Sequence, residues 1–214
     1  MKTAMALAAV AALGVCGAAQ AQDYQPKAKG SLILNVRATG VSPAGDDPIV
    51  TAAGAATGLK AHVGDDIMPT LGLTYFLTDN IAVEAIAGTT QHEVRAQGPG
   101  VDLAVHETWV LPPVVSLQYH FAPQAKVSPY VGAGVNYMIF YSGENKNGFD
   151  VDIDDGFGLA LQAGVDVALK DRWQLNVDVK KVFFETDASV NGGAMKSEVT
   201  LDPWVISAGI GYRF

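Results

Sequence analysis

Apolar residues alternate with small or polar residues along most of the chain that follows residue 30. In each such segment one face carries Leu, Val, Ile or an aromatic residue, while the other carries Gly, Ser, Thr, Asn or Gln. This period of two is typical of β-strands whose two faces meet different surroundings. The pattern predicts eight strands, which cover residues 31–38, 67–77, 80–88, 112–121, 129–141, 157–169, 173–180 and 201–214.

The connections between these segments alternate in length. Three are short, at residues 78–80, 122–129 and 170–172, and four are longer and polar, at residues 41–66, 91–107, 142–155 and 188–197. An even number of strands with short turns at one end and longer loops at the other is the organisation of an outer-membrane barrel. We therefore expect an all-β fold, an eight-stranded antiparallel transmembrane β-barrel with short periplasmic turns and longer extracellular loops.

The bulky apolar face of each strand is expected to point outward, toward lipid. A barrel of eight strands has a narrow interior that side chains fill, so the face with small and polar residues suits the lumen. Aromatic residues stand near strand ends, as Trp204 and Phe214 do in the last strand, which matches the girdles at membrane interfaces. The alternative is a soluble periplasmic ligand carrier of lipocalin type, whose apolar face would point inward.

The first residues have the pattern of a secretory signal peptide. Lys2 precedes an apolar run over residues 3–18, and the small residues of "AQA" follow at positions 19–21. This pattern predicts export and cleavage between Ala21 and Gln22.

Cleavage there would divide the chain into a removed signal peptide, residues 1–21, and a mature barrel domain, residues 22–214. It would also remove Cys16, the one cysteine of the chain, so neither a disulfide nor a thiolate metal site is expected in the mature protein. The formal net charge of −8 argues against a nucleic-acid partner, because phosphate binding needs a basic surface.

The strands and connections together resemble the OmpW family of outer-membrane proteins. The stretches that carry the resemblance are LGLTYFLTDNIAVE, LPPVVSLQYHF, PYVGAGVNY, AGVDVALKDRWQLNVDV and LDPWVISAGIGYRF. The resemblance implies an eight-stranded barrel among outer-membrane lipids and the passive uptake of small hydrophobic molecules. It also implies that the end of the chain, with Tyr212 and Phe214, is an assembly signal read by the barrel assembly machinery.

The "LPP" stretch, Leu111, Pro112 and Pro113, interrupts one predicted strand. Proline donates no backbone hydrogen bond, so two in succession should break the ladder inside a closed barrel. Unpaired backbone groups that face lipid cost free energy, so such a break should be rare and confined to a particular position in the wall. The functional hypothesis is a lateral opening through which an apolar solute leaves the lumen, and the alternative is a bend near the outer rim.

Inward polar residues are expected to fill the lower lumen. They are Asn35, Arg37, Glu84, Gln118, Asn136, Gln162, Asp166, Asn176 and Asp178. Of these, Arg37, Glu84 and Asp166 carry opposite charges and are expected to pair as a plug. The upper half, with Ile33, Met68, Met138 and Phe140, is expected to form an apolar pocket. Structural filling of the barrel is the alternative for both sets.

Other clusters do not support catalysis, a cofactor or a metal site. "DVDIDDG" at 150–156 is similar to a calcium loop, but Asp155 and Leu161 stand where that loop needs Gly and Glu, so an acidic rim is expected, with weak cation binding as the alternative. Ser116 and His120 are about 13 Å apart along one strand, too far for a nucleophile and its base. The remaining histidines, His62, His92 and His106, show no metal-ligand spacing.

The sequence therefore predicts a non-enzymatic outer-membrane barrel for the passive uptake of small apolar solutes. The alternative is a structural or receptor barrel that transports nothing. Neither hypothesis calls for a cofactor.

Overall fold

The computed structural model describes residues 24–44 and 46–214, so the predicted signal peptide and its cleavage site between Ala21 and Gln22 lie outside the described residues. Within this part of the chain every regular element is a β-strand, and no helix has the length and hydropathy needed to cross a membrane. The strands are β1 (Leu32–Ser42), β2 (Asp46–Thr51), β3 (Ala56–Val63), β4 (Asp66–Phe76), β5 (Ile81–Gly88), β6 (Thr90–Gly98), β7 (Val101–Leu111), β8 (Val114–His120), β9 (Val127–Asn145), β10 (Val151–Ile153), β11 (Gly156–Ala168), β12 (Trp173–Phe183), β13 (Glu185–Val190), β14 (Met195–Thr200) and β15 (Trp204–Arg213).

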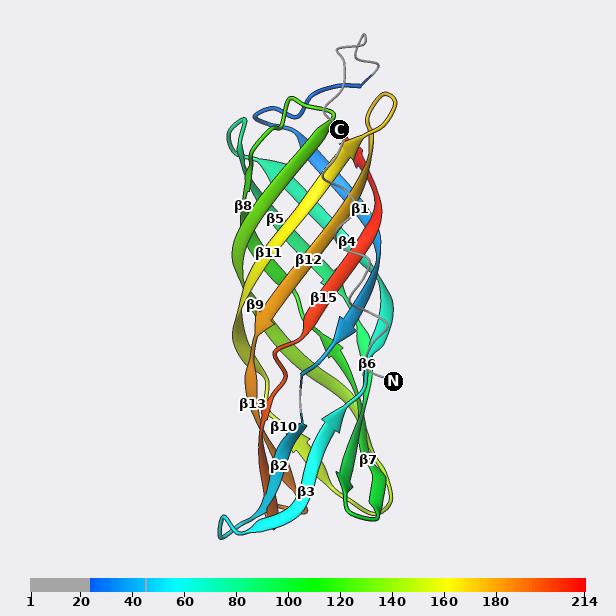
Figure 1. Ribbon diagram of the computed structural model, residues 1–214, viewed down its shortest axis with the longest axis vertical. Coiled ribbons are helices and arrows are strands. Elements are labelled where there is room, and N and C mark those ends of the chain that lie inside the picture. The colour runs from blue at the N-terminus through cyan, green and yellow to red at the C-terminus, as the bar shows by residue number, and fades with distance from the viewer. Residues whose placement is uncertain (1–23, 45) are drawn as a thin grey trace.

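Eight of these strands close into an antiparallel barrel (Figure 1). Their order around the barrel is β1, β4, β5, β8, β9, β11, β12 and β15, and β15 pairs again with β1. Short turns join them at the end where the chain terminates, which we call the turn end. The opposite end, which we call the hairpin end, lies at the bottom of Figure 1. Throughout, "upper" and "above" mean nearer the hairpin end, and "lower" and "below" mean nearer the turn end.

The two faces of the barrel strands differ as the alternation predicts. Outward side chains are large and apolar, as at Leu71 and Leu161, which are 56% and 54% exposed, whereas the inward Asn35 is 2% exposed. Trp173, Tyr212 and Phe214 pack edge to face on the outside near the turn end. The prediction of an eight-stranded barrel with its apolar face outward is confirmed.

The four long connections differ from the loops that the sequence predicts. They contain β2 and β3, β6 and β7, the end of β9 with β10, and β13 and β14, which extend the barrel at the hairpin end (Figure 1). Here the alternation is reversed, because apolar side chains such as Ile49, Val105 and Val199 point inward and are buried. Polar outward residues suit strands that stand in water beyond the bilayer, and they give these segments the composition of loops.

The ladder is interrupted between β7 and β8, at Pro112 and Pro113. On one side, β5 pairs with β8 as far as Ile86 opposite Val114, and β6 pairs with β7 from Thr90 opposite Val110. Residues 87–89 and 111–113 therefore face each other without ladder pairs.

On the other side of the interruption, β9 passes unbroken. Leu111 lies opposite Ile139, Val114 lies opposite Asn136, and the Tyr137 N–H donates to the Pro113 carbonyl at 3.2 Å. The break in the wall therefore opens between two stretches of chain, β5 with β6 on one side and β7 with β8 on the other, and leaves the contact with β9 in place.

Candidate functional site

An apolar cavity of about 120 Å³ lies inside the molecule between the barrel and the hairpin end. Its wall comes from both parts because the inward face is apolar above the barrel and small or polar within it. Met68, Met138 and Phe140 line it, together with Val110 and Val182. The cavity therefore lies at the level where the apolar face of the strands changes from outward, in the barrel, to inward, in the hairpins.

Ile33 does not line this cavity, so its assignment to the upper pocket is wrong. It is buried, as expected for its inward position, but it packs with Phe76 and Ala82 at the turn end. β1 begins at the turn end, so a residue near its first position lies far below the hairpin end. The alternation gives the face of a residue but not its height along the barrel.

Hydroxyl groups form part of the cavity floor. Thr39 Oγ1 lies 2.7 Å from Thr70 Oγ1 and 2.9 Å from Ser207 Oγ, and all three residues are buried. These hydroxyls satisfy one another's hydrogen bonds, so they present little unpaired polarity to the cavity.

A network of buried charges closes the lumen below this floor. Arg37 Nη2 donates to Glu84 Oε1 at 2.6 Å, and Lys180 Nζ lies 3.6 Å from Glu84 Oε2. Lys180 also donates to Asp178, which accepts a second bond from the Tyr130 hydroxyl at 2.8 Å. Two positive and two negative side chains therefore balance within the network. We call Arg37, Glu84, Asp178 and Lys180 the upper plug.

Asp166 belongs to a second group, nearer the turn end. Its carboxylate accepts from Lys27 Nζ at 2.5 Å, Asn176 Nδ2 at 2.7 Å and Gln174 Nε2 at 3.1 Å. The structure thus brings Arg37 and Glu84 together and pairs Asp166 with Lys27 instead.

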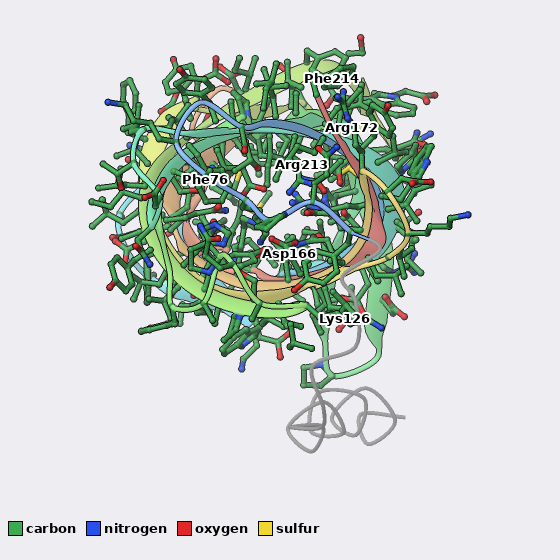
Figure 2. All side chains as sticks on the ribbon, turned by 90° about the horizontal axis from the view of Figure 1, so that it is seen from above. Phe76, Lys126, Asp166, Arg172, Arg213 and Phe214 are labelled. Atoms are coloured by element: carbon green, nitrogen blue, oxygen red, sulfur yellow. The ribbon has the colours of Figure 1, made fainter. Side chains whose placement is uncertain are left out.

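Lys27 reaches the lumen because the N-terminal segment crosses the mouth of the barrel at the turn end. Figure 2 shows this segment, residues 24–31, in blue over the opening, with Asp166 beneath it. Its backbone bonds to all three short turns: Gln25 N donates to Asp171 O, Lys27 N to Pro123 O, and Lys29 N to Asp79 Oδ1. The segment and the two groups of buried charges leave the lumen closed toward the turn end.

The sequence reasoning missed Lys27 and Lys180. Lys180 has the same alternation phase as Asp178, so the strand pattern already placed it inward. Lys27 precedes the first strand and carries no such signal. Its position depends on where the N-terminal segment crosses the mouth.

The break in the wall lies beside the cavity. Pro112 and Val114 line the cavity on one side of the break, and Ile86 and Gly88 line it on the other. Leu111 and Pro113 are half-buried between the cavity and the outer surface. The unpaired stretch of the wall therefore adjoins the apolar space.

The histidines and the acidic stretch contribute no ligand set. Among residues 24–44 and 46–214 no three His, Cys, Asp or Glu side chains converge in a way that would hold a metal ion. His92 and His106 lie on the β6–β7 hairpin, where a loop is predicted, and His120 faces the lumen near Lys27. Asp150, Asp152 and Asp154 are exposed at the hairpin end.

The sequence profile of the OmpW family matches residues 28–214. An uncharacterised outer-membrane protein, y4mB of Sinorhizobium fredii, is 38% identical over 216 residues and covers 95% of this chain and 93% of its own length. The dibenzothiophene metabolism operon protein PahQ of Pseudomonas aeruginosa is 32% identical over 162 residues, with coverage of 73% and 76%. These relatives are named as outer-membrane or metabolic-operon proteins.

Among solved structures, the crystal structure of the outer membrane protein OprG of Pseudomonas aeruginosa is similar throughout. It superposes with a TM-score of 0.84 at 30% identity and covers 90% of this chain and 99% of its own. The likeness extends over the barrel and the hairpin end together.

Proposed function

The chain belongs to the OmpW family and lies in the outer membrane as a transmembrane β-barrel, and from this premise we propose that it carries small hydrophobic molecules passively through that membrane. The solute would pass from the hairpin end into the apolar cavity and leave sideways, between β5–β6 and β7–β8, into the bilayer. No chemical step is part of this proposal. The protein would act as a non-enzymatic pore.

One observation carries the proposal: the cavity ends on a closed polar floor and adjoins a break in the wall. An apolar solute at that floor would meet buried ion pairs below and would have to separate them, and breaking one such pair costs about 3–5 kcal/mol. The break at Leu111, Pro112 and Pro113 leads instead to hydrocarbon. The name of PahQ refers to dibenzothiophene, an apolar molecule, and this supports the same class of solute.

The first test measures uptake by cells with and without the protein, using an apolar solute and a polar one of similar size. Faster uptake of the apolar solute alone supports the proposal. Equal uptake with and without a correctly folded barrel would favour a structural or receptor role. Folding in the outer membrane is checked by heat-dependent gel mobility.

The lateral route is tested by restoring the ladder. Pro112→Val with Pro113→Thr supplies two backbone donors and should reduce apolar uptake, because the wall can then close. Pro129→Val, at an exposed proline on β9 near the turn end, is the matched control and should leave uptake unchanged. Unchanged uptake in the double variant would refute the lateral exit.

Assembly and export complete the proposal. Tyr212 lies near the end of β15, and Phe214 follows that strand; their rings pack edge to face at 5.1 Å on the outer surface. We propose that the barrel assembly machinery reads this end of the chain after export by residues 1–21. Outer-membrane lipids then surround the outward apolar face.

A further inference from the structure

We propose that Asn136 is a hydrogen-bonding anchor in the cavity, and that the preferred solutes are small apolar molecules with one uncharged polar group. This inference rests on the proposed function and narrows its substrate class to alcohols, ketones and related compounds. The evidence for it is the unpaired side-chain amide of Asn136, the glycine opposite it and the break in the wall beside it.

Asn136 is a polar side chain without a partner. It lies on β9, lines the cavity and is 1% exposed. Neither Oδ1 nor Nδ2 has a hydrogen-bond partner among the described residues. A buried amide left unpaired is costly, so the site favours an occupant that accepts from Nδ2, as an alcohol or a ketone can, or donates to Oδ1, as an alcohol can.

The neighbouring strand leaves room for this amide. Gly158 on β11 lies directly opposite Asn136, and a Cβ at that glycine would stand 2.3 Å from Asn136 Oδ1 and 2.6 Å from the Phe183 carbonyl. Any other residue there would displace the amide or the backbone beside it. The position of the amide therefore depends on the glycine opposite.

Asn136 also stands at the inner side of the break. It pairs with Val114, the first residue of β8, and the next residue of its own strand, Tyr137, donates to the Pro113 carbonyl. A solute bound to the amide would rest its apolar part against Met138 and lie beside the proposed exit. The anchor and the exit thus share one stretch of wall.

The charges below the floor argue for an uncharged polar group. Lys180 lines the cavity, but its ammonium group is already used by Glu84 and Asp178, and Arg37 is paired with Glu84. Because the upper plug is balanced, an added carboxylate or ammonium would be buried without a counter-charge. Burying such a charge costs more free energy than burying a neutral hydroxyl or carbonyl group does.

The size of the cavity sets the scale of the solute. A cavity of about 150 Å³ lined by apolar side chains holds benzene, and the volume here is about 120 Å³. A single ring with a short polar substituent therefore suits the space. Toluene, benzyl alcohol and benzoate form a matched series of apolar, neutral polar and charged probes.

The experiment compares uptake of the three probes by cells with wild-type protein, Asn136→Leu or Met138→Leu, after subtracting uptake by cells without the protein. Wild type should favour benzyl alcohol over toluene and exclude benzoate. Asn136→Leu should slow benzyl alcohol by about two- to tenfold, the effect of one hydrogen bond, and spare toluene. Met138→Leu, which keeps the amide, should affect both neutral probes alike.

Two results would overturn the inference while leaving the proposed function intact: benzyl alcohol and toluene responding equally to Asn136→Leu, or benzoate passing as fast as benzyl alcohol. If wild type accelerates none of the probes, the proposed function fails and the inference fails with it.

A second measurement covers the case in which Asn136→Leu does not fold. Wild-type protein in lipid nanodiscs is titrated with each probe while the side-chain amide resonances of Asn136 are followed by NMR. Benzyl alcohol should shift these resonances and toluene should not. Resonances that do not shift when benzyl alcohol is added would mean that the amide does not bind it, which contradicts the inference.

Discussion

Tyr141 and Thr89 join their hydroxyl groups in a hydrogen bond on the outer surface, across the broken strand that separates them. Tyr141 lies on β9 and Thr89 lies in the gap between β5 and β6. The strand between them is β7–β8, with its interruption at Pro112 and Pro113. The bond therefore ties together the two sides of the stretch where the ladder is missing.

Removing this bond should make the wall easier to open. Tyr141→Phe deletes one hydroxyl, and a hydrogen bond contributes about 0.5–1.5 kcal/mol, so apolar uptake should rise about two- to tenfold if opening limits the rate. Uptake of an apolar probe by cells is the measurement. Tyr137→Phe, an outward tyrosine on the same strand that packs on Phe157, should change nothing. Equal rates in all three proteins would show that the bond does not hold the exit closed.

Breaking the upper plug should destabilise the barrel strongly. Glu84→Gln leaves Arg37 and Lys180 with one carboxylate fewer in a buried site, and removal of one partner from such a group costs about 3–5 kcal/mol. The free energy of unfolding in urea, measured in lipid vesicles, is the readout. Glu93→Gln removes an exposed carboxylate that pairs with Arg95 and should leave the unfolding midpoint almost unchanged. Similar losses in the two variants would argue against a plug that supports the fold.

Acidification should loosen the hairpin end through His92. The neighbours of His92 on β6, Gln91 and Glu93, are exposed polar residues, so this part of β6 stands beyond the outward apolar band. Burial lowers the pKa of His92, although its bond to the Gly64 carbonyl at 2.7 Å and the nearby Asp66 oppose this effect. The unfolded state then binds more protons, so stability is lost as the pH falls below the unfolded value of about 6.5.

The measurement for His92 is amide hydrogen exchange of β3 and β6 at pH 7.5 and pH 5.0, expressed as protection factors. Protection in wild type should fall at the lower pH. His92→Gln cannot gain a proton and should show a smaller fall. The same loss in both proteins would place the pH sensitivity elsewhere.

Deleting Phe214 should impair assembly more than stability. Its side chain is exposed and touches Tyr212 on the surface, so little packing is lost when it is removed. The expected result is accumulation of unfolded chains before insertion, seen as loss of the heat-modifiable form in cells. Refolding of the purified variant into vesicles should proceed as in wild type. A defect in refolding would instead assign Phe214 a structural role.

The barrel could be predicted from the sequence because each of its eight strands has one face in lipid and one in the lumen. The hairpin strands were missed although they alternate too. In β3, for example, Ala61 and Val63 point inward and Lys60 and His62 outward. Lysine and histidine on the outer face are typical of loops when the surroundings are unknown, and the sequence does not say where the bilayer ends.

The candidate site was predictable in part for a related reason. Alternation assigned Arg37, Glu84 and Asn136 to the lumen, and each is buried. Which of them meet depends on strand stagger and on side chains that follow no alternation, such as Lys27. Contacts across the lumen are a property of the closed barrel and not of any one strand.

The reversal of inside and outside at the hairpin end bears on how the molecule is made. Each hairpin turns its apolar face inward and its polar face outward, so lipid does not cover the apolar face. Beyond the bilayer that face can leave water only by packing on the other hairpins, as Ile49, Val105 and Val199 do. The hairpins therefore cannot bury their apolar faces one at a time, and their packing depends on the closed barrel that brings them together.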